Sequence, residues 1–205
     1  AAPYRSARAA QPWYRRVIAR AEETAAGMRR GSPEGLKLLA TIKRCESAFW
    51  LIQDGQGVEG ETNLFLQLLP PGDRRVTEAR ISHADALYLQ GRNDQAMQEL
   101  AAIAASTGGT MAAVDRMGLQ WGQALTLYEA GRYDEALPYL KATTEGRGFE
   151  HEEDVWPLLI KALAQSHRRT EAKAAYEQYI HHYKLNFSSM VELAMVVESA
   201  DVRPP

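Results

Sequence analysis

The sequence GRYDEALPYL at residues 131–140 joins two apolar runs and suggests how the whole chain folds. A similar string, GRNDQAMQEL, occupies residues 91–100, and a weaker copy, HRRTEAKAAY, occupies residues 167–176. The leading glycine can adopt a positive φ and so end a helix, and the aspartate that follows favours the start of the next helix. Each string therefore predicts the elbow of a helical hairpin.

The repeat extends over four copies when Gly55, Gly91, Gly131 and His167 are aligned, at steps of 36, 40 and 36 residues. A leucine stands four residues before each aligned position, and a small residue stands five residues after it. The small residue lies one turn into the second helix, where a larger side chain would hold the two helices apart. One hairpin cannot bury its apolar face alone, so the repeats should stack. The small residues are Gly60, Ala96, Ala136 and Ala172.

Apolar residues recur at three- and four-residue steps through most of the chain, and no alternating β-branched run appears. Ser32 and Pro33 have the chemistry of a helix N-cap and first helical residue. The pattern predicts an all-α single domain over residues 1–205, with a basic N-terminal arm at 1–32, hairpin repeats at 33–185 and a capping helix and tail at 186–205. The expected helices are 12–30, 33–54, 58–69, 75–90, 93–106, 111–130, 133–145, 152–166, 169–184 and 188–199.

The copy around residue 131 resembles the tetratricopeptide repeat (TPR), with Ala124, Gly131, Tyr133, Ala136 and Leu140 at the family's signature positions. The other copies are degenerate, and the period departs from the usual 34 residues. This resemblance covers roughly residues 40–185 and implies a TPR-like superhelical array of about four hairpins with extra terminal helices. A narrower resemblance, carried by RRTEAKAAYEQYIHHYKLNF, is to the bacterial transcriptional activator domain.

The TPR resemblance implies a concave groove lined by the first helix of each hairpin. Carrying the family's offsets onto this sequence gives an apolar and aromatic partner-binding set. A groove of this kind suits an amphipathic helix or an extended apolar segment of a protein or peptide partner. The predicted partner-binding residues are Phe49, Ile52, Ile81, Asp85, Tyr88, Leu89, Trp121, Leu125, Tyr128 and Lys161.

The chain's own ends compete for these apolar surfaces. Trp13, Val17 and Ala21 share one face near the N-terminus, and Met190, Leu193, Val196 and Val197 share one near the C-terminus. Terminal helices commonly cap repeat arrays, so self-capping is expected, with a homodimer contact as an alternative.

Charge is unevenly distributed, although the net charge is only −2. Residues 1–44 hold ten Lys/Arg and three Asp/Glu, whereas the remainder holds fourteen and twenty-three. The basic arm could meet nucleic acid or an acidic partner, but it more simply faces the acidic remainder of its own fold. Nucleic-acid binding through this chain is therefore not expected.

No catalytic, metal or cofactor signature stands out. The stretch GFEHEEDVW, centred on His151, lacks the spacing of a zinc signature, and STGGT at 106–110 lacks the lysine of a phosphate-binding loop. Neighbouring His181 and His182 point in different directions on a helix, and Cys45 on an apolar face is expected to be a packed thiol. We expect no enzyme activity, no metal and no cofactor.

These patterns indicate a non-catalytic protein–protein interaction module: an adaptor or scaffold, a chaperone-like carrier or a regulatory domain. Two alternatives stay open: the ligand-sensing regulatory domain of a bacterial transcriptional activator, and an envelope or export assembly factor. No run of apolar residues is long enough to cross a membrane. A cytoplasmic location is expected, or a periplasmic one if Ala1 is a processed N-terminus.

Overall fold

The computed structural model describes residues 2–107, 111–145, 152–183 and 187–200. These residues form ten α-helices and no strand. The predicted all-α hairpin architecture is confirmed, and most helix boundaries fall within three residues of the expected ones. The chain divides into two compact units, unit 1 at Ala1–Thr110 and unit 2 at Met111–Pro205.

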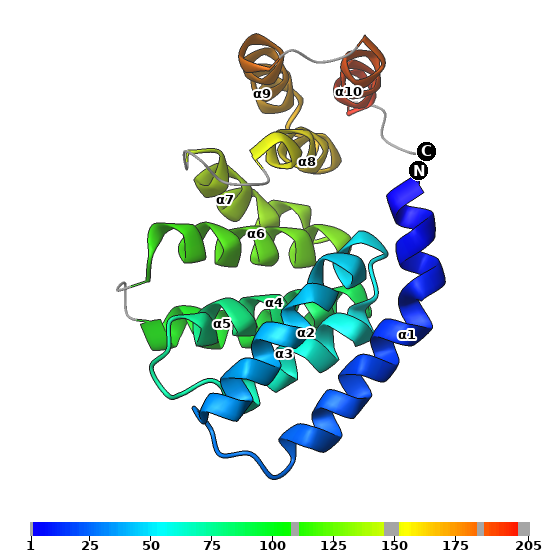
Figure 1. Cartoon of the computed structure of the whole chain (residues 1–205). Coiled ribbons are helices and arrows are strands. Elements are labelled where there is room, and N and C mark those ends of the chain that lie inside the picture. The colour runs from blue at the N-terminus through cyan, green and yellow to red at the C-terminus, as the bar shows by residue number, and fades with distance from the viewer. Residues whose placement is uncertain (1, 108–110, 146–151, 184–186, 201–205) are drawn as a thin grey trace. The chain divides into compact units, whose positions relative to one another are not determined.

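Unit 1 contains two helical hairpins and a long helix packed against the first of them (Figure 1). Helix α1 contacts both helices of the first hairpin, and α3 packs against the first helix of the second hairpin. Their shared core includes Ile18 of α1, together with Ile42 and Leu64 of the first hairpin, all nearly inaccessible to solvent. The helices are α1 (Ala2–Ala25), α2 (Pro33–Leu51), α3 (Gly55–Leu68), α4 (Arg75–Leu89) and α5 (Asn93–Thr107).

Unit 2 repeats the hairpin plan and ends in a single helix. Helix α7 packs between α6 and α8, and the last helix, α10, packs on both α8 and α9. Leu193 and Val197 of α10 are buried, as expected for a helix that covers the end of a repeat array. The helices are α6 (Ala113–Glu129), α7 (Tyr133–Thr144), α8 (Glu152–Gln165), α9 (Arg169–His182) and α10 (Phe187–Ser199).

Three elbows share one backbone geometry, in which a left-handed residue ends the first helix of the hairpin. Gly91 has a φ of 74°, and its N–H donates to the carbonyl of Tyr88 at 2.8 Å. The N–H of Arg92 then reaches back to the carbonyl of Leu87 at 2.9 Å. This pair of bonds is the Schellman motif, which satisfies carbonyls that a helix end leaves unpaired. The other two elbows have the same pair of N–H to carbonyl bonds. One elbow has Gly131 to Tyr128 and Arg132 to Leu127, and the other has His167 to Ala164 and Arg168 to Leu163.

The first elbow corrects the sequence alignment. The left-handed residue is Gln53, with a φ of 53°, and the N–H of Asp54 donates to the carbonyl of Phe49. Gly55 is already the first residue of α3 and does not end α2. The repeat is therefore displaced by two residues here, and Phe49 takes the place that Leu87 holds in the next hairpin.

Glycines in α3 serve close packing instead of a turn. A Cβ on Gly57 would lie 2.3 Å from the ring of Phe49, and a Cβ on Gly55 would lie 2.9 Å from the carbonyl oxygen of Ala86 in α4. Both distances are shorter than a carbon side chain tolerates. The glycine-rich start of α3 therefore lets α2 and α4 approach it closely, which explains why glycines cluster there.

The small residues of the other elbows occupy the sites predicted for them. Ala96, Ala136 and Ala172 are each completely buried. The N–H of each donates to the carbonyl of the arginine four residues before it, which fixes the first turn of the second helix.

Asp54 attaches α1 to the first elbow. As the N-cap of α3, its carboxylate accepts from the N–H of Gly57 at 3.2 Å. The same carboxylate accepts two bonds from Arg15, at 2.6 and 2.9 Å, and one from Gln11 at 2.8 Å. Burial opposes its charge, but the bonds from Arg15 and Gln11 outweigh burial and lower the pKa of Asp54. Part of the basic arm therefore does pair with the chain's own acidic residues.

Helix α1 is longer than predicted at its N-terminus and ends earlier. It begins at Ala2, runs through Pro12 and ends at Ala25, two residues before Gly27. The expected start at residue 12 is wrong, since Pro12 lies inside α1 although proline is disfavoured in helix interiors. The predicted cap of α2 is confirmed, since the N–H of Gly35 donates to the Ser32 hydroxyl at 3.1 Å.

The elbow geometry predicts that Gly91→Ala destabilises unit 1 by about 1–2 kcal/mol, because an L-residue is strained in the left-handed region. Steric crowding of the new methyl group does not contribute, since no atom lies within 4 Å of a Cβ placed on Gly91. Gly27→Ala is the matched control, because its site is equally open and has no positive φ. Urea unfolding measures both variants, and equal midpoints would contradict the strain argument.

Candidate functional site

The structure separates the predicted groove residues of unit 1 by burial. Phe49 is completely buried, and Ile81 is only 8% exposed, so both belong to packed surfaces. Phe49 contacts the ring of Tyr14 edge-on at 5.9 Å. The displaced register of the first hairpin accounts for this, because it turns Phe49 towards α3. Ile52, Tyr88 and Leu89 are half-buried.

Asp85 is the unusual member of this set. Its side chain is part-buried on α4, and no hydrogen bond or ion pair to its carboxyl is found among the described residues. Burial raises the pKa of Asp85 to about 7. A carboxyl in such a place is uncharged for about half of the time at neutral pH, and it can then donate a hydrogen bond.

In unit 2, three of the predicted residues share one face of α6. Trp121, Leu125 and Tyr128 stand four and three residues apart, and each is half-buried. The ring of Tyr128 packs edge-on against Tyr133 at 5.2 Å, and burial raises the pKa of its hydroxyl. Lys161 lies on α8 and forms an ion pair at 3.0 Å with Glu192 of α10. Lys161, which was predicted to bind a partner, is therefore paired with the chain's own terminal helix.

Unit 2 also has a hollow between α7 and α9, with α8 as its floor. Its volume is about 580 Å³, and it is open to solvent. Apolar side chains cover the floor, and Gln178 and His182 stand on the rim. This depression is called the α7–α9 groove, and it is lined by Lys141, Thr144, Glu145, Trp156, Leu159, Leu163, Glu171, Ala174, Ala175, Gln178 and His182.

The walls of the α7–α9 groove are held by stacking and by charge. The indole of Trp156 lies almost parallel to the ring of Tyr179, with centroids 6.3 Å apart. Across the rim, Lys141 of α7 pairs with Glu171 of α9 at 3.0 Å, and Arg168 pairs with the same carboxylate. The sequence did not predict this groove, because the TPR resemblance places the partner-binding residues on the first helix of each hairpin. The adjacent Ala174 and Ala175 were the available signal.

A second hollow lies in unit 1 between α1 and α2, with a volume of about 330 Å³. It includes the face of Trp13, Val17 and Ala21 that was predicted to cap the array. This depression is called the α1–α2 groove, and it is lined by Trp13, Arg16, Val17, Arg20, Ala21, Thr24, Leu38, Thr41 and Ile42.

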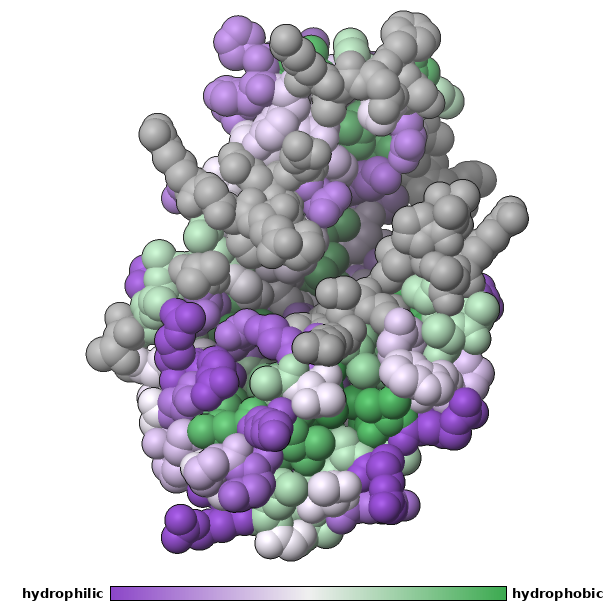
Figure 2. All heavy atoms as spheres, in the orientation of Figure 1, coloured by the Kyte–Doolittle hydropathy of each residue, from purple (hydrophilic) through white to green (hydrophobic). Residues whose placement is uncertain are grey.

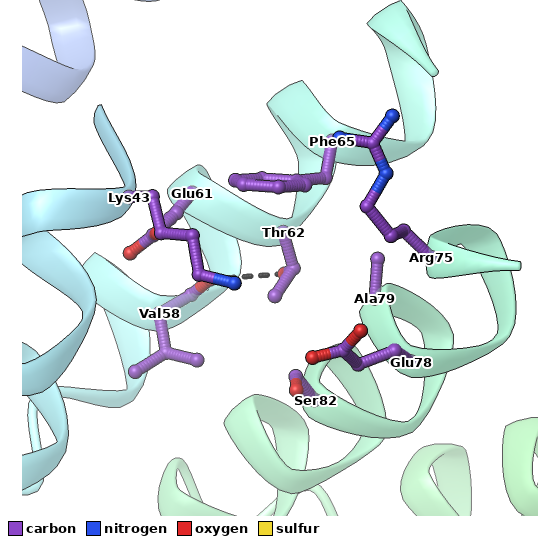
Figure 3. A pocket seen from close by; sticks show the side chains of 9 residues that line it. All are labelled: Lys43, Val58, Glu61, Thr62, Phe65, Arg75, Glu78, Ala79 and Ser82. Carbon is purple, nitrogen blue, oxygen red and sulfur yellow. Dashed lines mark hydrogen bonds between the residues drawn. The ribbon is translucent and has the colours of Figure 1, made fainter. Parts of the chain in front are cut away.

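A small cavity between α2, α3 and α4 carries charged groups (Figure 3). Lys43 approaches from α2, Phe65 and buried Glu61 from α3, and Glu78 from α4. About 30 Å³ is free inside it. This is room for one or two waters, whereas small-molecule sites occupy about 300–1,000 Å³. The cavity therefore gives no support to ligand sensing.

Ionisable side chains also link the second hairpin of unit 1 to the first. Nδ1 of His83 lies 2.6 Å from Glu99 of α5, and Nε2 lies 3.9 Å from Glu59 of α3. The hydrogen bond to Glu99, with the charges of both carboxylates, raises the pKa of His83 against the effect of burial. Because Arg92 and Gln90 also bind Glu59, the cluster is explained as a tie between helices.

Other residues singled out in the sequence are placed as follows. Cys45 is buried as predicted, and burial raises the pKa of its thiol. His181 and His182 are exposed on α9. Residues 146–151, with His151, and residues 108–110 lie outside the described part. Within that part, no cluster of three or more metal-ligating side chains occurs, and no helix is long and apolar enough to span a bilayer.

The surface carries apolar patches separated by hydrophilic residues on the face shown in Figure 2.

The fold class follows from the hairpins themselves: two stacked helical hairpins and an end helix make unit 2 a TPR-like helical module. Residues 111–193 match the family model of the bacterial transcriptional activator domain. The match begins where unit 2 begins and ends within α10, and it confirms the narrower resemblance predicted for this segment. No curated protein and no solved structure matches the chain.

Asp85 generates a pH prediction. Its folded pKa is raised above the usual value of 3.8 to about 7, so ionisation costs stability as pH rises from about 4 to 7. Asp85→Asn should therefore raise the melting temperature, with a gain of about 1–2 kcal/mol at pH 8 for this part-buried group. Thermal melts at pH 4 and pH 8 test this: the variants should differ little at pH 4, and a pH-independent difference would contradict it.

Proposed function

We propose that the chain is a non-catalytic protein-recognition module of a bacterial transcriptional regulator. Unit 2, which matches the bacterial transcriptional activator domain, would bind a helix or peptide of a partner protein. The observation that carries this proposal is the α7–α9 groove, which lies entirely within the matched segment.

The shape and chemistry of this groove support recognition of a polypeptide. Its volume is within the range of binding sites, and it is open to solvent. Half-buried Trp156 offers apolar contact beside Leu159 and Leu163, which are themselves almost wholly buried, while the rim offers hydrogen-bonding and charged groups. An apolar centre with a polar rim is the common anatomy of protein interfaces. The face of Trp121, Leu125 and Tyr128 on α6 stays a predicted second contact of the same unit.

The test is transcriptional. The full chain is fused to an unrelated DNA-binding domain and tethered upstream of a weak promoter in a bacterial host. Reporter transcription should exceed that of the DNA-binding domain alone. Ala174→Arg should return it to that level, because Ala174 is exposed and lines the groove, so the new side chain fills the groove without removing core atoms.

Thr170→Arg is the matched control, because Thr170 is exposed on the same helix and does not line the groove. It should leave transcription unchanged. The double variant Trp121→Ala with Tyr128→Ala reports on the α6 face, provided that circular dichroism shows an intact helical fold. No activation by the wild-type fusion would contradict the regulatory role, and equal activity of the two arginine variants would contradict the groove.

A further inference from the structure

The α1–α2 groove of unit 1 includes an aromatic side chain that is largely exposed to solvent. Trp13 is 55% exposed, and the other large apolar side chains found exposed among the described residues are Val191 and Met195. Around it the groove is mainly apolar, with Val17 and Leu38 half-buried beside it. Solvent exposure of an indole over apolar neighbours is typical of a recognition surface.

Trp13 is held by a row of rings that leads into the core. Its indole packs edge-on against Tyr14, with centroids 5.1 Å apart, and Tyr14 packs edge-on against the buried ring of Phe49. Arg15 and Asp54 fix the same turn of α1 to the first elbow. The indole therefore sits on a braced helix and loses little freedom when a partner covers it. Braced aromatic residues are the usual anchors of binding energy.

The rim of the groove is basic. Arg16 and Arg20 stand one turn apart on α1, and none of the nine lining residues is acidic. Arg16 has no ion pair among the described residues, and Arg20 pairs only with Glu23, at a highly exposed site where such pairs contribute little. On α2, exposed Lys37 lies one turn before Thr41 and exposed Glu34 lies one turn before Leu38, so their charges offset each other. The positive charge that a partner meets therefore comes from α1.

The shape selects a helix as the occupant. The groove runs between two neighbouring helices, and a third helix packs into such a groove with its side chains between theirs. A peptide that binds by β-strand addition needs an open sheet edge, and the described part of the chain has no strand. Apolar residues on one face would meet Trp13, and carboxylates beside them would meet Arg16 and Arg20.

From these contacts we infer that the α1–α2 groove docks an acidic amphipathic helix of a partner protein. The inference rests on the proposed recognition function and adds to it a second surface, in the other unit, with a defined partner chemistry. A second copy of the chain fits less well: the exposed Val191 and Met195 lie on α10, whose Glu192 and Glu198 already pair with Lys161 and Arg169. Nucleic acid fits less well because the groove is apolar and its aromatic residue stands alone.

The probe is a fluorescein-labelled helical peptide of about 18 residues, or five turns, with leucines on one face and glutamates on the others. Fluorescence anisotropy with the full chain should show saturable binding that weakens with added salt. Trp13→Ala should weaken binding by about tenfold or more, as expected for an anchor residue. Arg16→Glu with Arg20→Glu should weaken it at least as much.

Controls separate the groove from charge alone. Arg29→Glu with Arg74→Glu reverses the same number of charges at other exposed sites of unit 1 and should have little effect. The same peptide with lysines in place of glutamates should bind weakly, and so should an acidic peptide with its leucines replaced by serines. The proposal is overturned if the lysine peptide binds as well or if Trp13→Ala changes nothing in a protein that melts like wild type.

Two other occupants would also overturn the proposal. Concentration-dependent dimerisation that Trp13→Ala abolishes, measured by analytical ultracentrifugation, would assign the groove to a second copy. Displacement of the peptide by a DNA duplex at physiological salt would assign it to nucleic acid. Because the reporter test depends on variants of unit 2 and this one on variants of unit 1, failure of either proposal is recognised independently of the other.

Discussion

The left-handed residue at each elbow is the constraint on which the fold depends. It ends one helix, and the two backbone bonds that follow it direct the chain back along the first helix. In the last three elbows, the buried alanine at the start of the next helix then decides how closely the pair can pack. These are local requirements, each met within six residues of sequence. Where they are met, the leucines that precede the elbows, Leu87, Leu127 and Leu163, are buried between helices.

Attachment of α1 requires a second constraint, supplied by Asp54. Its carboxylate caps α3 and accepts from Arg15 and Gln11 at the same time. The glycines of α3 add to this, because Gly60 leaves room for Ile18: a Cβ there would lie 2.8 Å from that side chain. Capping and close approach together place α1 beside α2, and the α1–α2 groove is the space left between them. A binding surface thus arises from a structural ion pair.

The sequence was sufficient for the helices because periodicity and elbow chemistry are local. It predicted the turns at Gly91, Gly131 and His167 and missed the one at Gln53. The nearby Gly55 looked like the helix terminator, whereas its lack of a side chain is needed for the contact with α4. A glycine in a sequence does not show which of these two needs it meets, because the second depends on a helix that lies about thirty residues further along the chain.

The candidate surfaces were harder to predict, for a related reason. The α6 face of Trp121, Leu125 and Tyr128 follows from spacing on one helix, and the structure places them together. The α7–α9 groove depends on three helices, and the small side chains of Ala174 and Ala175 are part of its lining. Phe49 illustrates the reverse error, since a two-residue displacement turns an expected contact residue into core. Surfaces made between helices require the tertiary arrangement.

The elbows also differ in a way that bears on motion. Gly91 and Gly131 adopt positive φ without strain, whereas Gln53 and His167 carry side chains there, at a cost of about 1–2 kcal/mol each. The unstrained turns belong to the two middle hairpins in the sequence, and the strained ones to the first and last. Strain lowers the free energy of local opening. Of the four elbows, those at Gln53 and His167 therefore gain the least stability from their own backbone, and the first depends instead on the bonds of Asp54 to Arg15 and Gln11.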